Sequence, residues 1–200
     1  GKTAYDWINF LKESGQSWWQ ILPLGPTSYG DSPYQSFSSA AGNPYLIDLD
    51  MLIEEGLLEK KDLSGINWGE NPERVDYGAI FNSRFSVLHK AYLKGKDTMK
   101  EEFEDFREEN EEWVEDYALF MSLKKHFDMK SWLDWPDEKA RKRDEDALKS
   151  YREALSDDIS YYAFLQFLFF RQWNNLRRYA KKNNIGIIGD IPIYVALDSA

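Results

Sequence analysis

The segment 25–44 carries the side chains best suited to chemistry. It is rich in Gly, Pro, Ser, Tyr and Asn, and it follows "WWQILPLG", whose aromatic and branched residues predict a short buried strand. Aromatic rings can stack on the apolar face of a pyranose, while hydroxyl, carboxylate and amide groups bind its hydroxyls. The pattern suits a sugar-binding loop, but it also suits a loop whose Gly, Pro and Ser only shape turns. The candidate side chains are Tyr29, Asp31, Ser32, Tyr34, Gln35, Asn43 and Tyr45.

Two aspartates near the end of the chain form a second group of candidates. The segment "IGIIGDIPIYVALDSA", residues 185–200, predicts another buried strand and contains Asp190 and Asp198. Carboxylates that cleave glycosidic bonds lie about 5–10 Å apart, whereas eight residues of continuous strand would separate these two by about 26 Å. Unless the chain folds back, they are not a catalytic pair. Asp190 suits a buried structural aspartate as well as a substrate contact, and Asp198, after the strand, is the better candidate for a site at the strand end.

Metal and cofactor chemistry finds little support in the sequence. His89 and His126 are the only histidines, each on a predicted helix, and solvated or core-edge positions are commoner for such residues than metal ligation. The chain has no phosphate-binding, dinucleotide-binding, serine-hydrolase or zinc-peptidase motif. We therefore expect neither a metal nor a cofactor.

The elements that must position these residues alternate between helix and strand at both ends of the chain. Trp7, Ile8 and Leu11 recur at helical spacing, with Thr3 as a candidate cap and Gly15 as the stop. Gly56 is a plausible stop for a later helix. Further helices are predicted over 76–95, 101–127 and 159–183, the last containing the buried stretch "YYAFLQFLFF", and the charged segment 136–155 predicts a solvated helix with i,i+4 ion pairs.

This order of elements predicts an α/β fold with a helical insertion. The two predicted strands are some 160 residues apart, too far for a single strand–helix–strand crossover of about 30 residues. We therefore expect three parts: residues 1–50 with the first strand and its loop, a mainly helical insertion over 51–156, and residues 157–200 with a helix and the second strand.

The amino-acid composition limits the classes of partner that the chain is expected to bind. There are 35 acidic residues against 25 basic ones, and the resulting net charge of -10 disfavours nucleic acid and anionic membrane surfaces. The stretch 161–170 is about half the length needed to cross a bilayer. The chain lacks cysteine and Asn-x-Ser/Thr sites, and its first residues do not have the pattern of a secretory signal, which together favour the cytoplasm.

Three motifs make the chain recognisable. "WWQILPLGPTSYGDSPYQSFSSAAGNPYLIDLDMLIEEGLL", residues 18–58, resembles the signature stretch of amylomaltases, or 4-alpha-glucanotransferases, of the alpha-amylase clan. "GIIGDIPIYVALDSA" is similar to the third-strand motif of that family, and "RVDYGAIFN", residues 74–82, also fits. The resemblance implies part of a (β/α)8 TIM barrel, in which the two strands here are the second and third and the inserted helices form a subdomain.

The resemblance also implies an activity. Members of the family transfer segments of alpha-1,4-glucan between maltodextrins or to glucose by a retaining double displacement, which needs an aspartate nucleophile, a glutamate acid/base and a third aspartate. In the family these lie on later barrel strands, so no catalytic residue is expected in this chain. The implied partners are maltooligosaccharides, alpha-1,4-glucans and glucose.

The family's binding residues can be carried over at matching positions. Ser32 and Tyr34 of "GDSPYQ" match positions that line the glucan subsites near the scissile bond, and Asp198 matches a sugar-contacting aspartate. Tyr29 matches a tyrosine of a secondary glucan-binding groove, and we add Gln35 and Asp190 as further candidate contacts.

Two other readings of these motifs remain open. The whole enzyme could be an alpha-glucan hydrolase of the same clan, or these residues could form a glucan-binding fragment without catalysis. An amino-terminal fragment is expected to be inactive alone and to expose apolar strand faces.

Overall fold

The computed structural model describes residues 1–27, 30–71, 73–192 and 196–200. Over these residues the protein is mostly helical, with two short parallel strands. The helices and strands are α1 (Lys2–Glu13), β1 (Trp18–Gln20), α2 (Leu49–Glu54), α3 (Tyr77–Thr98), α4 (Lys100–Glu109), α5 (Val114–His126), α6 (Glu138–Arg141), α7 (Glu145–Ala154), α8 (Ser156–Lys182) and β2 (Gly186–Ile188). Three short 3-10 helices also form, η1 (Pro44–Leu46), η2 (Lys60–Leu63) and η3 (Trp132–Asp134).

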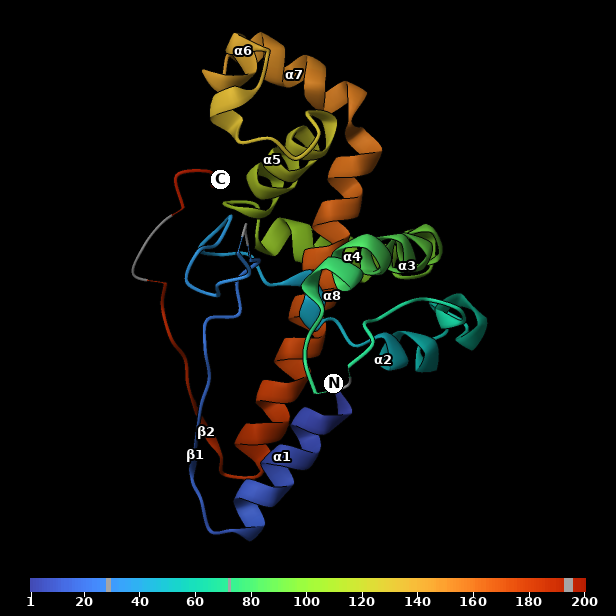
Figure 1. Ribbon diagram of the computed structural model, residues 1–200, viewed down its shortest axis with the longest axis vertical. Helices are drawn as coiled ribbons and strands as arrows, with labels where there is room; N and C mark the ends of the chain where they lie inside the picture. The colour runs from blue at the N-terminus through green and yellow to red at the C-terminus, as the bar shows by residue number, and fades with distance from the viewer. Residues whose placement is uncertain (28–29, 72, 193–195) are drawn as a thin grey trace.

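Helix α8 is the axis of the molecule. It runs along the long dimension in Figure 1, with α5, α6 and α7 around one end, α1 and the two strands at the other, and α2, α3 and α4 to one side. The predicted buried stretch 161–170 lies within this helix and is almost entirely buried, as expected. Phe164 illustrates the packing, since its ring centre lies 5.6 Å from that of Tyr92, 5.2 Å from that of Phe103 and 5.5 Å from that of Phe167.

The two strands pair in parallel, with Trp18 opposite Gly186 and Gln20 opposite Ile188. Two backbone hydrogen bonds extend the ladder, from Gly186 N–H to the carbonyl of Ser17 and from Ile21 N–H to that of Ile188. The regular strands are much shorter than the predicted segments, because the chain leaves the ladder soon after Gln20 and Ile188. Sequence reasoning identified the pairing segments but overestimated their length.

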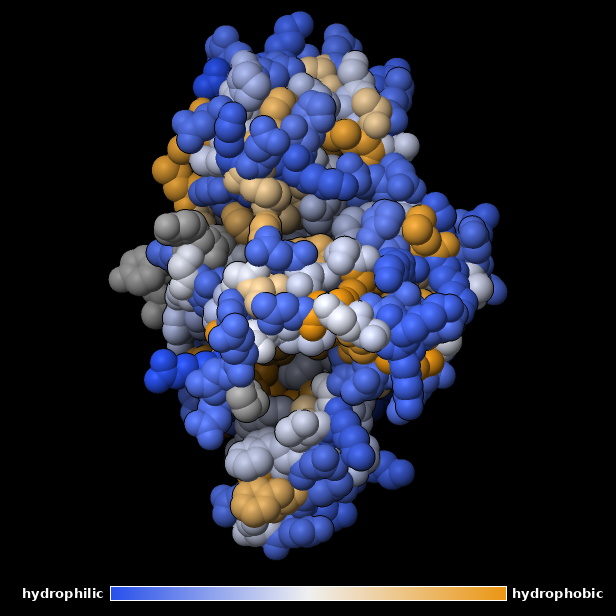
Figure 2. Space-filling view, turned by 45° about the vertical axis from the view of Figure 1, so that its right-hand side comes forward, coloured by the Kyte–Doolittle hydropathy of each residue, from blue (hydrophilic) through white to orange (hydrophobic). Residues whose placement is uncertain are grey.

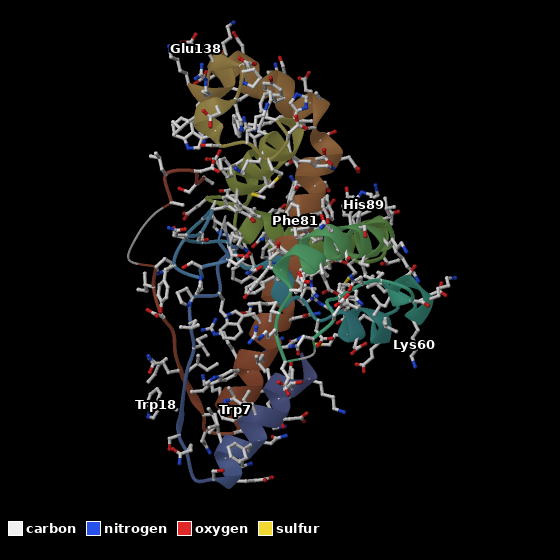
Figure 3. The ribbon with its side chains drawn as sticks, viewed as in Figure 1. Trp7, Trp18, Lys60, Phe81, His89 and Glu138 are labelled. Atoms are coloured by element: carbon white, nitrogen blue, oxygen red, sulfur yellow. The ribbon has the colours of Figure 1, made fainter. Side chains whose placement is uncertain are left out.

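Only one face of this sheet is covered in the part of the chain that the structure describes. Helices α1 and α8 pack on that face through a small core made of Ile8, Leu11, Leu176, Ala180 and Ile185, with Trp19 and Ile187 against it. On the other side Trp18 is 64% exposed and Ile188 is 45% exposed, and Figure 3 shows Trp18 at the outer edge beside β1. Within the described residues the strands are therefore covered on one face only, and the other face shows the apolar exposure expected of an amino-terminal fragment.

Apolar surface is also visible elsewhere at this end of the molecule. Trp7 and Phe10 of α1 stack on one another with ring centres 5.3 Å apart, and both are exposed. Figure 2 shows hydrophobic surface at the narrow lower end and within the recess above it, on a face that is otherwise mainly hydrophilic.

Among the described residues, no helix has the length and apolar character needed to cross a membrane.

Some local predictions hold and others fail. Gly15 and Gly56 follow α1 and α2 with positive φ angles of 71° and 76°, as expected of helix stops. Thr3 is not a cap, because α1 begins one residue earlier at Lys2. The charged segment 136–155 forms two helices rather than one, since the chain turns at Arg143, with φ of 57°, and Asp144 caps α7.

A hydrogen-bonded ion pair between α3 and α8 predicts that the protein loses stability at low pH. Tyr92 donates a hydrogen bond to Asp157 Oδ1 at 2.9 Å, and Lys96 Nζ lies 3.3 Å from the same oxygen. The hydrogen bond from Tyr92 and the nearby Lys96 charge lower the pKa of Asp157. Because the folded-state pKa lies below that of the unfolded chain, this stabilisation is present above the ordinary aspartate pKa of about 4 and is lost as the pH falls through the lowered value.

We therefore expect Asp157→Asn to reduce the difference between the urea midpoints measured at pH 7 and pH 3. Tyr92→Phe, which removes the donor, should act in the same direction. If both variants show the same difference in urea midpoint between pH 7 and pH 3 as the unaltered chain, the Asp157 carboxylate does not contribute to the loss of stability in acid.

Candidate functional site

The loop between β1 and η1 is closed by its own backbone. Asn43 N–H donates to the carbonyl of Leu24 at 2.8 Å, which brings the two ends of the loop together. Within it Thr27 pairs with Ser36 in an isolated antiparallel bridge, and the buried Ser36 donates its hydroxyl to the carbonyl of Ser38 at 2.7 Å. These bonds connect parts of the loop that the structure describes, residues 25–27 and 30–43, and so support the side chains that they carry.

Two glutamines of α8 hold the exit of this loop. Gln166, which is fully buried, accepts from Gly42 N–H at 2.7 Å and donates to the Gly42 carbonyl at 3.0 Å. Six residues later Gln172 makes the same pair of bonds with Asp48, at 2.7 Å and 3.1 Å. A carboxamide matches both polar groups of a peptide unit, so these two side chains fix the segment 42–48 along the helix. Neither glutamine was predicted as a functional residue, although a glutamine within "YYAFLQFLFF" is a polar group that needs a buried partner.

Tyr34 and Asp190 meet, although 156 residues separate them. The Tyr34 hydroxyl donates to Asp190 Oδ2 at 2.9 Å, and Asp190 Oδ1 accepts from Ile191 N–H at 2.8 Å. The hydrogen bond to Asp190 raises the pKa of the Tyr34 hydroxyl, because ionising the hydroxyl would remove the donated proton and place a second negative charge beside the carboxylate. The contact forms because both residues follow parallel strands, whose carboxyl ends lie at the same edge of the sheet.

Ser32 and Gln35 lie beside Tyr34 in a tight turn. Ser32 Oγ accepts from Tyr34 N–H at 3.3 Å, and the Ser32 carbonyl accepts from Gln35 N–H at 3.1 Å. Asp31, just before the turn, has a φ of 55°, and Gln35 is exposed. Tyr29, the remaining loop candidate, lies outside the described residues. The cluster of Ser32, Tyr34 and Asp190 offers hydroxyl and carboxylate groups near the surface, which suits the binding of neutral, hydroxyl-rich molecules.

Asp198 is bound at a second location by α5 and η3. Its Oδ2 lies 2.5 Å from Lys124 Nζ, and its Oδ1 accepts from Trp132 N–H at 3.1 Å. The Trp132 indole N–H donates to the Leu197 carbonyl at 2.8 Å. Asp190 and Asp198 thus have separate partners. Lys124 and Trp132 were not predicted from the sequence.

Asn43 and Tyr45 support the chain rather than face a site. Asn43 is buried, and its side chain accepts from Tyr45 N–H at 2.9 Å, which caps η1. The Tyr45 ring packs between those of Tyr77 and Phe85, with centres 6.3 Å and 5.9 Å away. Nearby, Arg84 donates to the carbonyls of Pro44 and Ile47, and burial lowers the pKa of Arg84 to about 10.

The histidines pack against aromatic rings. The His89 ring centre lies 5.1 Å from that of Tyr161, and the His126 ring centre lies 5.6 Å from that of Tyr151. Within the described ranges, no cluster of three or more His, Asp or Glu side chains could hold a metal ion.

A cavity of about 230 Å³ lies away from the loop cluster, between α5 and the shorter helices near it. Its walls come from Asp116, Leu119, Phe120, Leu123, Trp132, Trp135, Ala140, Arg141, Arg143, Leu148, Ser199 and Ala200. Ser32, Tyr34 and Asp190 are not among these wall residues; each of the three is partly buried.

The family model and two relatives that match this chain are all described as 4-alpha-glucanotransferases. The family model described as 4-alpha-glucanotransferase matches residues 1–200. The chain is 52% identical over 201 residues to a 4-alpha-glucanotransferase of Clostridium butyricum and 48% identical over 204 residues to one of Thermus thermophilus, and each alignment covers the whole of this chain. It spans only 41% and 40% of those two relatives.

Solved structures agree in fold. An amylomaltase from Streptococcus agalactiae in complex with acarbose superposes with a TM-score of 0.94 at 47% identity, covering 100% of this chain and 40% of that one. An amylomaltase from Corynebacterium glutamicum superposes with a TM-score of 0.70 at 17% identity over 96% of this chain and 27% of that one, which shows a shared fold.

Proposed function

The chain belongs to the 4-alpha-glucanotransferase family, and from this premise we propose that it forms the glucan-binding amino-terminal part of an enzyme that transfers alpha-1,4-glucan segments between maltodextrins or to glucose. The observation that carries the proposal is the contact between Tyr34 and Asp190, which joins the loop after β1 to the end of β2. Both residues lie in the motifs that resemble the family, and together they form a polar surface suited to sugar hydroxyls.

The chemical step is assigned to residues outside these 200. A retaining transfer proceeds by attack of a carboxylate nucleophile on the anomeric carbon, with a second carboxyl group that protonates the leaving oxygen and then deprotonates the acceptor hydroxyl. The separate contacts of Asp190 and Asp198 give these two aspartates no shared reaction centre. In this proposal the chain binds and orients the glucan: Tyr34 offers a ring face, and Ser32, Gln35, Asp190 and Asp198 offer hydrogen-bonding groups. Tyr29 retains its proposed role in a secondary groove.

The proposal includes the position of the chain in a (β/α)8 barrel. Helices α1 and α8 each precede a strand and cover the same face of the sheet, while the opposite face carries exposed apolar side chains. This is the arrangement expected of two neighbouring barrel strands with their outer helices. We take β1 and β2 as the second and third strands, and residues 51–156 as a helical insertion between residues 1–50 and 157–200. A cytoplasmic location stays a prediction.

A chimera tests the proposed activity. This chain would be joined to the remaining part of the Clostridium butyricum relative, and maltotriose would be incubated with the chimera and, separately, with the 200 residues alone. Glucose together with longer maltodextrins from the chimera alone is the expected result. Glucose and maltose without elongation would favour hydrolysis instead, and transfer by the 200 residues alone would contradict the position assigned to the catalytic carboxylates.

The loop assignment predicts that Tyr34→Ala weakens maltoheptaose binding by about fivefold, because a ring that stacks on a sugar and its hydrogen bond are both lost. Tyr34→Phe is the matched control, because it keeps the ring and removes only the hydroxyl that binds Asp190. Its loss of affinity for maltoheptaose should therefore be smaller than that of Tyr34→Ala. Isothermal titration calorimetry with maltoheptaose or acarbose measures both. An affinity unchanged in Tyr34→Ala would contradict the assignment of this loop to glucan binding.

A further inference from the structure

Lys124 is a charged residue inside the helical region. Its side chain is 1% exposed, and it lies on α5 among mostly buried neighbours. Its Nζ donates to Asp198 Oδ2 at 2.5 Å and to the carbonyl of Lys130 at 3.1 Å. The ring centres of Phe37 and Phe120 lie 4.9 Å and 5.7 Å from the same nitrogen. These groups compensate for removing the ammonium from water, a cost that a lysine without partners could not meet.

The partners of this lysine come from both strand-end segments. Phe37 belongs to the loop after β1, and Asp198 belongs to the segment after β2. The two segments also touch directly, because Ala200 N–H donates to the Phe37 carbonyl at 2.8 Å. Trp132 adds two further bonds, from its backbone to Asp198 and from its indole to Leu197. The ammonium thus sits where the helical region, the first loop and the second segment converge.

The Asp198 carboxylate retains capacity for a ligand. An ionised carboxylate offers about four acceptor positions, and bonds to the described residues use one on each oxygen of Asp198, for Lys124 and Trp132. Its side chain remains 28% exposed, so Asp198 is held by its partners without being closed off from solvent. A carboxylate fixed in this way binds a hydroxyl without first losing its own freedom of rotation, which improves affinity.

We propose that Lys124 is a positioning residue for glucan binding: it holds Asp198 and the loop containing Phe37 in the arrangement that accepts a maltooligosaccharide. The proposal rests on the proposed function, because it takes Asp198 as a sugar contact. It gives the helical region a part in the site, since the buried charge comes from α5 rather than from a strand-end loop.

A double-mutant cycle tests the role of Lys124. Lys124→Met keeps an unbranched side chain but removes the charge, and Asp198→Asn keeps the shape of the carboxylate. Each should weaken maltoheptaose binding by about tenfold, the effect of one hydrogen bond to a charged group, and the double variant should be no weaker than Asp198→Asn alone. Lys125→Met is the matched control, because that neighbouring lysine is 51% exposed and pairs with Asp158 at 2.7 Å. Additive losses, or an affinity unchanged in Lys124→Met, would overturn the positioning role.

A spectroscopic measurement separates this role from a general loss of stability. In a chain labelled with 15N-lysine, the buried and bonded Lys124 ammonium should exchange slowly enough with water to give a cross-peak, whereas the ammonium of an exposed lysine such as Lys125 should exchange too fast to give one. Loss of the peak in a folded Lys124→Met variant would confirm the assignment. Asp198→Asn should remove or shift that peak while the backbone spectrum stays folded, and maltoheptaose should shift it in the unaltered chain. A peak that is insensitive to Asp198→Asn would overturn the proposal even if Lys124→Met failed to fold. Absence of binding by the unaltered chain would instead overturn the glucan site itself.

Discussion

Replacing Gln166 with leucine is expected to lower the free energy of unfolding by about 3 kcal/mol. Gln166 is fully buried, and its carboxamide satisfies both the N–H and the carbonyl of Gly42. Leucine has a similar volume but offers no hydrogen bond, so two buried backbone groups lose their partners, and each such loss costs about 1–3 kcal/mol. Urea denaturation followed by circular dichroism measures the change.

An exposed glutamine provides the control for this prediction. Gln16→Leu alters a residue whose only side-chain bond to the described part of the chain is a long one to the Ser14 carbonyl at 3.4 Å, so it should change stability by less than about 0.5 kcal/mol. Because Gly42 ends the candidate glucan loop, Gln166→Leu should also weaken maltoheptaose binding at temperatures where the variant is folded. Equal free energies of unfolding for the two variants would mean that the hydrogen bonds between Gln166 and Gly42 contribute nothing to stability.

The second large effect is expected at Gly95, where α3 crosses α8. A Cβ atom at this position would lie 2.4 Å from Phe164 Cζ and 3.1 Å from its Cε1, and the Phe164 ring is fully buried between other aromatic rings. Gly95→Val therefore forces the helices apart or the ring out of its position, at an expected cost of about 3 kcal/mol. Thermal and urea unfolding should both report the loss.

Gly78 in the first turn of the same helix is the matched control. The nearest atom to a Cβ there is Asp76 Oδ1 at 3.5 Å, an ordinary contact distance. Gly78→Ala should be neutral or stabilising by up to about 1 kcal/mol, because alanine favours the helix more than glycine does. If Gly95→Val proves as stable as Gly78→Ala, the close approach of α3 to Phe164 is not a constraint on the fold.

The candidate site was partly predictable from the sequence. The loop after the first strand and Asp190 were both identified from residue types and from their positions after apolar segments, and the structure brings Tyr34 and Asp190 into contact. The contact itself could not be read from the sequence, because it depends on which strands pair and in what register. Lys124 was missed for a related reason: Lys124 and Lys125 are adjacent and of the same type, yet one is 1% exposed and the other 51% exposed.

The exposed face of the sheet shows that residue types alone do not determine burial. Branched and aromatic residues around Trp18 and Ile188 predict buried strands, whereas the resemblance to part of a barrel predicts that apolar strand faces are exposed. Within the described chain only α1 and α8 supply a cover, and Trp18 and Ile188 stay exposed. A residue's hydrophobicity indicates the environment that it favours, whereas the neighbours that create this environment come from the rest of the fold.

The sequence by itself determined the local elements, the family motifs and the chemical character of the loop, because helix periodicity, turn residues and side-chain types act over a few neighbouring positions. Tertiary structure alone decided that Gln166 would hold Gly42, that Tyr34 would reach Asp190, and that Lys124 rather than Lys125 would pair with an aspartate from the segment after β2. Each of these contacts joins residues at least 74 positions apart. Such pairs form only when packing around α8 has buried one side chain next to another, and the need to satisfy buried polar groups then selects the partners.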